Sequence, residues 1–374
     1  MKKIISVVLV LLLSFNNVYA FDGISAKAYI LMEQSTGTVI VEKNSNVKMK
    51  PASTTKILTA ICAIENSRLT DIVTVSKKAA YQEGSSVYLK PGDQISMEDL
   101  VYGLMLNSGN DAAVAIAEHI SDDTEKFSFV MNNKAKDIGA VNSNFKNPNG
   151  LDDDDHYVTA YDLALITSYA LNNDKFKNIV ASKSKIISDK NGVKKYLSNH
   201  NKMLHLYDGC IGVKTGFTKK SGRTLVTAAR RNGVNLVAVT LNAPDDWDDH
   251  KKLLDEGFLR VKKEIIIDKN KIVDNVEVKK GTVDFLPVKC KEEYYGVKIS
   301  DEASDYDVIY KYRKLKAPVK KGDEAGEVFV LKNGKEVFKT KLITTEGTER
   351  KKGFSLIEFL KRIFGYDKTS EIYK

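Results

Sequence analysis

A serine and a lysine stand three residues apart in the stretch PASTTKILTA, which runs from Pro51 to Ala60. The apolar residues that follow have the spacing of a buried helix face. A lysine beside such a face is unusual, because burying an ammonium group is costly unless it is paired. On one helix face Ser53 and Lys56 would be close enough to touch. Desolvation would lower the pKa of Lys56, and the neutral amine could then serve as the base that a serine nucleophile needs. Alone, the pair is weak evidence, because its spacing recurs by chance in many helices.

Two further motifs make the serine–lysine pair more specific. Ser108-Gly109-Asn110 is expected in a short loop between two helices, and Lys214-Thr215-Gly216 on a strand, where glycine permits close backbone approach. Singly, the first could be an ordinary turn and Lys214 an ordinary exposed lysine. In this order and on these elements, the three motifs form the set found in class A β-lactamases and penicillin-binding proteins.

The elements that must position these motifs can be predicted from the spacing of apolar residues. Residues 27–43 predict two strands joined by a turn, and residues 208–242 predict further strands, followed by a helix over about 246–260. Between them, about 53–180 is rich in predicted helices, with a helix from about Ser53 and capping patterns at Ser96 and Thr159. Because the first two strands need partners, we expect them to pair with the distant strands of 208–242.

The chain is expected to contain a second, smaller domain. Residues 263–348 alternate apolar and charged residues, and Asn333-Gly334 separates two such runs as a hairpin turn would. This region contains no plausible catalytic cluster. We therefore expect a catalytic domain over 21–262 and a small β domain over 263–348, the latter a spacer or docking module.

The two ends of the chain suggest export and attachment to a membrane. Residues 1–20 have a basic start, a short apolar run and small residues before Phe21, as in a signal peptide. Residues 349–374 place apolar side chains on one helical face, with basic residues beside it. Such a helix could pack on its own domain, but its terminal position and basic flank favour an amphipathic helix on a membrane surface.

Composition limits the other classes of function. The net charge is +9, which favours an anionic environment, but the basic residues are scattered and the chain is expected to be exported, so no nucleic-acid role is expected. Three cysteines are too few for a disulfide framework, although one bridge stays open. The five histidines show no ligand spacing, and the acidic run 152–155 is interpreted as a solvated loop. We expect no metal and no cofactor.

With these motifs, the chain resembles the D-alanyl-D-alanine carboxypeptidases, which are low-molecular-mass penicillin-binding proteins. The resemblance extends over nearly the whole chain and includes NPNGLDDDDHYVTAYDLA and DGCIGVKTGFTKKSGRTLVTAA. It implies an α+β fold of the penicillin-binding/β-lactamase type, with an antiparallel sheet flanked by helices, then a small all-β domain and a C-terminal amphipathic helix. It also implies location on the outer face of the cytoplasmic membrane. The implied substrate is a peptidoglycan stem peptide ending in D-Ala-D-Ala, and β-lactams would acylate the same serine.

The resemblance also implies a role for each motif residue. Ser53 attacks the carbonyl between the terminal D-alanines, and Lys56 takes its proton. Ser108 passes a proton to the leaving nitrogen, while Asn110 holds Lys56 and the substrate amide. Lys214 adds positive potential, and Thr215 binds the substrate carboxylate beside Gly216. The backbone N–H groups of Ser53 and Phe217 form the oxyanion hole. His200 could help to hold the carboxylate, or could be an ordinary surface histidine.

Two alternatives stay open from the sequence, and a third, a β-lactamase, is disfavoured. A class A β-lactamase would need a Glu-x-x-Leu-Asn pattern, which is absent between Asn110 and Lys214. A D,D-endopeptidase or transpeptidase would use the same motifs, because only the leaving group or acceptor differs. A non-turnover penicillin-binding module would keep the motifs without releasing product.

Overall fold

The computed structural model describes residues 21–299 and 306–352 of the 374-residue chain. These residues divide into two units, one ending at Lys262 and one beginning at Lys263, with Ile299 grouped with the first. The expected signal peptide and nearly all of the expected amphipathic tail lie outside the described residues. No helix within the described ranges is long and apolar enough to cross a membrane.

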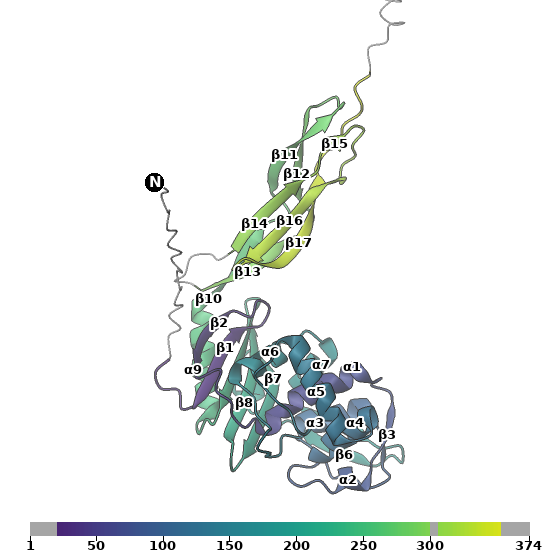
Figure 1. Ribbon diagram of the computed structural model, residues 1–374, viewed down its shortest axis with the longest axis vertical. Helices are drawn as coiled ribbons and strands as arrows, with labels where there is room; N and C mark the ends of the chain where they lie inside the picture. The colour runs from purple at the N-terminus through teal and green to yellow at the C-terminus, as the bar shows by residue number, and fades with distance from the viewer. Residues whose placement is uncertain (1–20, 300–305, 353–374) are drawn as a thin grey trace, which may run out of the picture. The chain divides into compact units, whose positions relative to one another are not determined.

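An antiparallel sheet organises the first unit (Figure 1). Its strand order within the described residues is β2 (Val39–Lys43), β1 (Ala28–Glu33), β9 (Val234–Leu241), β8 (Gly222–Arg231) and β7 (Cys210–Thr218). β1 pairs with β9, so that Tyr29 stands opposite Thr240. The expected pairing of the N-terminal hairpin with distant strands is therefore confirmed, and it leaves β7 at an edge of the sheet.

Helices cover both faces of this sheet (Figure 1). A large apolar cluster lies between one face and the helices, and α1 contributes Ile57 and Ile61 to its centre. On the other face lies α9 (Asp246–Arg260), which buries Leu253 and Leu254. The helices on the first side are α1 (Lys56–Asn66), α3 (Met97–Leu106), α4 (Asn110–Ser121), α5 (Thr124–Ile138), α6 (Ala160–Ala170) and α7 (Asp174–Ala181).

The helix predicted from about Ser53 begins three residues later than expected. Residues Ala52–Thr55 form a 3-10 turn, η1, and α1 begins at Lys56. The Thr54 N–H donates to the carbonyl of Pro51 at 3.3 Å, the tighter bonding of a 3-10 turn. The other predicted starts are confirmed, because Ser96 caps α3 and Thr159 caps α6 through their hydroxyls.

Shorter elements complete the first unit. They are α2 (Lys77–Ala80), α8 (Met203–Leu206), the pair β3 (Ile72–Thr74) and β4 (Gln94–Ser96), and the hairpin of β5 (Ser184–Ser188) and β6 (Lys194–Ser198). The segment that follows β6 contains His200 and α8 and leads directly into edge strand β7.

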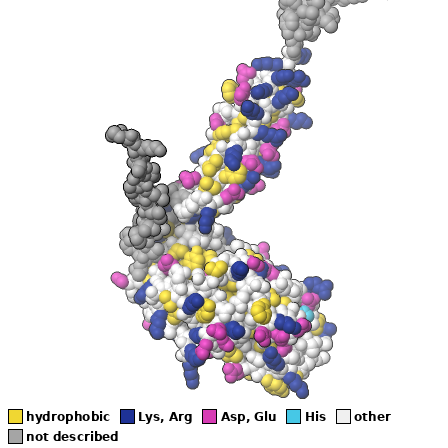
Figure 2. Space-filling model, viewed as in Figure 1, with side chains coloured by type: hydrophobic (Ala, Val, Ile, Leu, Met, Phe, Trp, Pro, Cys, Tyr) yellow, Lys and Arg dark blue, Asp and Glu magenta, His cyan; other side chains and the backbone are white. Residues whose placement is uncertain are grey.

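The second unit consists of strands in the described residues. Its main sheet has the order β14 (Tyr306–Tyr312), β16 (Glu324–Lys332), β17 (Lys335–Thr344), β12 (Phe285–Cys290), β11 (Ile272–Lys279) and β15 (Leu315–Lys316). β10 (Val261–Ile267) pairs with β13 (Tyr294–Ile299). The hairpin predicted at Asn333-Gly334 is confirmed between β16 and β17. On the face seen in Figure 2, basic and acidic side chains are interspersed in this unit.

Candidate active site

Ser53 lies where the sheet and the helices of the first unit meet. It belongs to η1, immediately before α1, and a Cβ built on Gly216 of β7 would lie 2.9 Å from the Ser53 backbone nitrogen. The same Cβ would lie 2.5 Å from the Thr224 hydroxyl, which donates to the Pro51 carbonyl at 3.0 Å. Only glycine lets the edge strand approach the serine this closely.

Lys56 is fully buried, and its Nζ atom has three oxygen neighbours. The Ser53 Oγ atom lies at 3.1 Å, the Asn110 Oδ1 atom at 2.7 Å and the Asn149 carbonyl oxygen at 2.6 Å. A neutral amine has two N–H groups and one lone pair. The amide and carbonyl oxygens can only accept, so they take the two N–H groups, and the lone pair is left for the Ser53 hydroxyl proton. This geometry fits a base that acts on Ser53.

The surroundings of Lys56 favour the neutral amine. Burial holds the pKa of Lys56 well below its ordinary range, and the charge of Lys214 lowers it further. The carboxylate of Asp111 acts in the opposite direction, but it is a smaller effect than either. The predicted desolvation of Lys56 is therefore present in the structure, and it arises mainly from burial.

Asn110 is held so that its oxygen faces Lys56. Its Nδ2 atom donates to the Glu83 carbonyl at 2.6 Å, which fixes the orientation of the side-chain amide. The next residue, Asp111, is buried and accepts hydrogen bonds from the Ser86 hydroxyl at 2.6 Å and from the Leu89 N–H at 3.0 Å. The start of α4 thus anchors the segment 83–89 beside the site.

Ser108 is buried in the turn between α3 and α4, with a left-handed backbone at φ 61°. It lies two residues from Asn110, in the turn where the Gly109 N–H donates to the Gly103 carbonyl at 3.1 Å. The expected placement of this motif between two helices is confirmed, except that Asn110 is already the first residue of α4.

Lys214 is buried too, so it is not an ordinary exposed strand lysine. Its Nζ atom donates to the carbonyl of Thr215 at 2.9 Å, and burial lowers its pKa to about 7. It is close enough to Lys56 for the two charges to repel. Near neutral pH, Lys214 is therefore only partly charged, and its positive potential is weaker than the sequence suggested.

The side chains of Thr215, Phe217 and His200 are more exposed to solvent than those of the two lysines. Thr215 is half-buried on edge strand β7, and Phe217 is 66 % exposed. His200 is exposed at the residue level, yet partial desolvation of its ring and the charge of Lys214 lower its pKa. The His200 backbone N–H donates to the carbonyl of Leu106, two residues before Ser108, at 3.2 Å. His200 therefore lies beside the site, although in the described residues it makes no hydrogen bond to Ser53 or Lys56.

Two residues that support the site were missed from the sequence. Asn149 supplies the carbonyl that Lys56 contacts, and His156 lies behind η1, where its Nε2 atom is 2.9 Å from the Thr55 hydroxyl. The His156 Nδ1 atom accepts from the Lys146 N–H at 3.3 Å, so Nε2 carries the proton. The stretch Asn147-Pro148-Asn149-Gly150 was a turn signal that could have drawn attention to this loop.

The acidic run 152–155 forms a largely exposed loop next to the end of β7. The Asp152 carboxylate accepts from the Thr218 hydroxyl at 3.0 Å, and Asp154 is 3.8 Å from Lys220. In the described residues no group of histidine, cysteine, aspartate or glutamate side chains could hold a metal ion. The three cysteines are free thiols.

Comparison with known proteins places this site in a family. The family model for D-alanyl-D-alanine carboxypeptidases matches residues 16–245, which is more than half of the chain. The chain belongs to the D-alanyl-D-alanine carboxypeptidase family. A second model, for the C-terminal domain of penicillin-binding protein 5, matches residues 262–350. The family assignment and the α+β fold with its all-β second part are therefore confirmed.

Several known proteins are similar to this chain over 63% to 91% of its length. D-alanyl-D-alanine carboxypeptidase DacF of Bacillus subtilis is 33% identical over 352 residues, covering 91% of this chain and 89% of that protein. Penicillin-binding protein 5 of Haemophilus influenzae superposes with a TM-score of 0.66 at 28% identity, covering 89% of this chain and all of the other. A DD-transpeptidase of Streptomyces K15, in an S96A mutant, has a TM-score of 0.60 at 31% identity, over 63% of this chain and 98% of the other.

Proposed function

We propose that this chain is a serine-type D-alanyl-D-alanine carboxypeptidase that removes the terminal D-alanine from peptidoglycan stem peptides. The observation that carries the proposal is the buried Lys56 Nζ atom, which lies 3.1 Å from the Ser53 Oγ atom and within hydrogen-bond distance of two oxygens that can only accept, from Asn110 and Asn149. That arrangement suits a general base acting on a nucleophile. Family membership supplies the class of substrate.

In the proposed reaction, the Ser53 oxygen attacks the carbonyl carbon of the penultimate D-alanine while Lys56 takes the hydroxyl proton. The negative charge that develops on the carbonyl oxygen would be met by the N–H groups of Ser53 and Phe217. The carbon–nitrogen bond then breaks, and the proton reaches the leaving nitrogen by way of Ser108. Water attacks the resulting ester, which releases the shortened peptide as a carboxylate and restores Ser53.

Several contacts support the other parts of this proposal. Asn110 would hold Lys56 through Oδ1, as its bond to the Glu83 carbonyl requires. The close approach of Gly216 to the Ser53 nitrogen supports an oxyanion hole formed by the N–H groups of Ser53 and Phe217. Thr215 would bind the substrate carboxylate. Lys214 would add positive potential there, and His200 would help to hold the carboxylate. β-Lactams would acylate Ser53 by the same attack.

A transpeptidase or endopeptidase is the second candidate, favoured by the similarity to the Streptomyces K15 DD-transpeptidase. The attack by Ser53 would be the same, and only the acceptor or the leaving group would differ. The match of residues 262–350 to the C-terminal domain of penicillin-binding protein 5 favours the carboxypeptidase.

The proposed site of action is outside the cytoplasm, at the membrane and the cell wall. Residues 1–20 would direct export, and the tail from 349 would lie on the membrane surface. Both proposals rest on the sequence pattern of these segments. The membrane proposal is tested by flotation with anionic vesicles of the mature chain and of a chain that lacks residues 353–374. Equal flotation of the two chains would contradict it.

The activity is tested by incubating the mature chain with a peptide that ends in D-Ala-D-Ala and measuring free D-alanine. We expect release by the wild type and by Ser182→Ala, a serine at the end of α7, but none by Ser53→Ala. No release by the wild type would contradict the carboxypeptidase. A cross-linked peptide dimer and a D-amino acid acceptor, supplied in parallel, would then reveal an endopeptidase or a transpeptidase.

A further inference from the structure

One end of the second unit, at the turn between β11 and β12, collects basic residues from three segments that are far apart in the sequence. The segments are 279–284, 316–323 and 346–352, and they carry eight basic and four acidic residues, a net charge of +4 against +9 for the whole chain. We call this surface the basic end, and Figure 2 shows several of its basic side chains on the visible face. Its basic residues are all exposed: Lys279, Lys280, Lys316, Lys320, Lys321, Arg350, Lys351 and Lys352.

Backbone hydrogen bonds hold the three segments of the basic end side by side. The Ala317 N–H donates to the Lys279 carbonyl at 2.9 Å, which joins the first two segments. Val319 and Thr348 exchange two N–H···O bonds, at 2.9 and 2.8 Å, which join the second segment to the third. The positive charges are therefore carried on fixed, folded backbone, although the basic residues are scattered along the sequence.

Within the basic end, positive charges stand directly beside one another. Lys279 of β11 pairs with Lys316 of β15. The preceding pair, Val278 and Leu315, is buried, so the two lysines share the exposed side of these strands. Like charges directly opposite on neighbouring strands are destabilising. An anionic surface that neutralises both lysines would remove this repulsion.

Acidic side chains balance few of the charges of the basic end. Among the described residues, Lys351 is the one member of the set with an ion pair, at 3.0 Å from Asp284. The Asp323 carboxylate is engaged by backbone, since it accepts from the Lys320 N–H at 2.8 Å. Most of the lysines of this surface therefore keep their charge directed to solvent.

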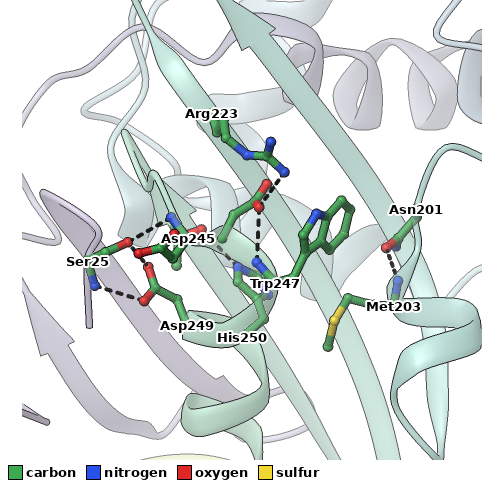
Figure 3. Close-up of polar contacts among 10 residues, drawn as sticks. Ser25, Asn201, Met203, Arg223, Asp245, Trp247, Asp249 and His250 are labelled. Atoms are coloured by element: carbon green, nitrogen blue, oxygen red, sulfur yellow. Dashed lines mark hydrogen bonds and ion pairs between the residues drawn. The ribbon is translucent and has the colours of Figure 1, made fainter. Parts of the chain in front are cut away.

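Several basic side chains elsewhere in the chain do have acidic partners. On neighbouring strands of the same sheet, Lys341 lies 2.6 Å from Glu324. In the first unit, Arg223 donates to the Asp246 carboxylate at 2.6 Å (Figure 3). The basic end differs from these places in leaving its charges for a partner outside the chain.

The chemistry of the basic end suits a lipid surface better than a single small anion. Its charges are exposed and spread over three segments, as contacts with many head groups require. Two exposed apolar side chains lie at the same end, Val283 in the β11–β12 turn at 46% and Phe285 at the start of β12 at 61%. Basic residues over anionic head groups, with apolar side chains at the acyl boundary, are typical of binding at a membrane surface.

We infer that the basic end of the second unit docks on the head groups of an anionic lipid bilayer, as a membrane contact separate from the C-terminal tail. The described chain reaches Lys352 in this surface, and the residues that follow belong to the segment expected to form an amphipathic helix. A bilayer that holds this segment lies within reach of the basic end. The inference rests on the proposed location at the membrane, but the folded unit itself carries the charges.

The experiment measures how the mature chain without residues 353–374 partitions onto vesicles of phosphatidylcholine, with and without phosphatidylglycerol. This chain keeps every described residue of both units. We expect it to bind the anionic vesicles and not the neutral ones, and to be released as salt screens the charges. In the triple variant Lys280→Gln/Lys316→Gln/Lys320→Gln, the partition coefficient should fall roughly 10- to 100-fold. The same three changes should also weaken vesicle binding by the full-length chain.

A matched control removes three exposed lysines from the opposite end of the same unit. Lys271 precedes β11, Lys291 follows β12 and Lys335 begins β17, so their triple glutamine variant has the same net charge as the first. It should bind anionic vesicles as the wild type does. Equal loss in both triple variants, or no binding of the chain without its tail to anionic vesicles, would overturn the inference. Binding of soluble poly(glycerol phosphate) without binding of vesicles would overturn it too, and would assign the surface to an anionic polymer.

Release of D-alanine from a soluble D-Ala-D-Ala peptide is measured in parallel, with thermal unfolding to confirm that each variant is folded. Both sets of changes lie outside the first unit, so we expect the wild type and the two triple variants to release D-alanine equally. Absence of release from all three would contradict the carboxypeptidase, while the vesicle measurements would still decide the docking.

Discussion

The Nζ atom of Lys56 lies 2.6 Å from the backbone carbonyl oxygen of Asn149, a residue outside the three sequence motifs. This contact takes the second N–H of the neutral amine, after Asn110 has taken the first. The lone pair is then left for the proton of Ser53. The loop around Asn149 therefore helps to make Lys56 a base, although it adds no titratable group of its own.

Gly150 should be sensitive to substitution for this reason. Its φ is 86°, and an added Cβ would lie 1.9 Å from the Ala52 carbonyl oxygen, next to Ser53. Gly150→Ala should displace η1 and the Asn149 carbonyl, and so sharply reduce acylation by a β-lactam. Gly37→Ala is the matched control, because its φ is 68° and nothing lies within 4 Å of the added Cβ. The control should lose only about 1–2 kcal/mol of unfolding free energy and keep its acylation rate. Equal acylation by both variants would contradict the role of this loop.

Replacing Lys214 should shift the pH dependence of acylation. The charge of Lys214 lowers the pKa of Lys56, so removing that charge in Lys214→Gln should raise it. A base with a raised pKa loses its proton at higher pH, and the acid limb of the profile should move to higher pH. The acylation rate of benzylpenicillin, followed from acidic to alkaline pH, measures this shift. Lys219→Gln, in the exposed turn, should leave the limb in place. If the acid limb of Lys214→Gln stays at its wild-type pH or moves to lower pH, the charge of Lys214 does not lower the pKa of Lys56.

His156 should make the first unit less stable in acid. Burial lowers its pKa from 6.5 to about 4, so between these values the folded state binds fewer protons than the unfolded state. The free energy of unfolding must then rise with pH in this window and fall on acidification. The contribution is about 3 kcal/mol. Chemical unfolding at several pH values measures this: the free energy of unfolding should depend less on pH in His156→Gln than in the wild type. His205→Gln, which alters an exposed histidine, should keep the wild-type pH dependence. An identical slope in all three proteins would be inconsistent with a neutral buried His156.

Much of this fold could be predicted from the sequence because its signals are local. The caps at Ser96 and Thr159 and the turn at Asn333-Gly334 were each visible as short patterns, and each is present in the structure. The helix start at Ser53 was placed too early, because a 3-10 turn and the first turn of an α-helix have nearly the same residue spacing.

The supports of the site could not be predicted in this way. The Asn149 carbonyl and the Glu83 carbonyl are backbone groups, which leave no signature in side-chain type. The contact between Thr55 and His156 joins residues 101 positions apart. Such contacts depend on how distant segments pack, and that packing is not visible in the local patterns of a single sequence.

The central claim is that neutral Lys56 activates Ser53, and the rate of covalent acylation tests it most directly. Wild type, Lys56→Met and Lys56→Arg would be mixed with benzylpenicillin, and the adduct followed by intact mass and located by peptide mapping, with thermal unfolding confirming that each variant is folded. We predict one adduct, on Ser53, and a rate roughly 10²- to 10⁴-fold lower in Lys56→Met. Arginine should not restore it, because its side chain stays charged. Acylation of Lys56→Met at the wild-type rate, or an adduct on another residue, would contradict the account.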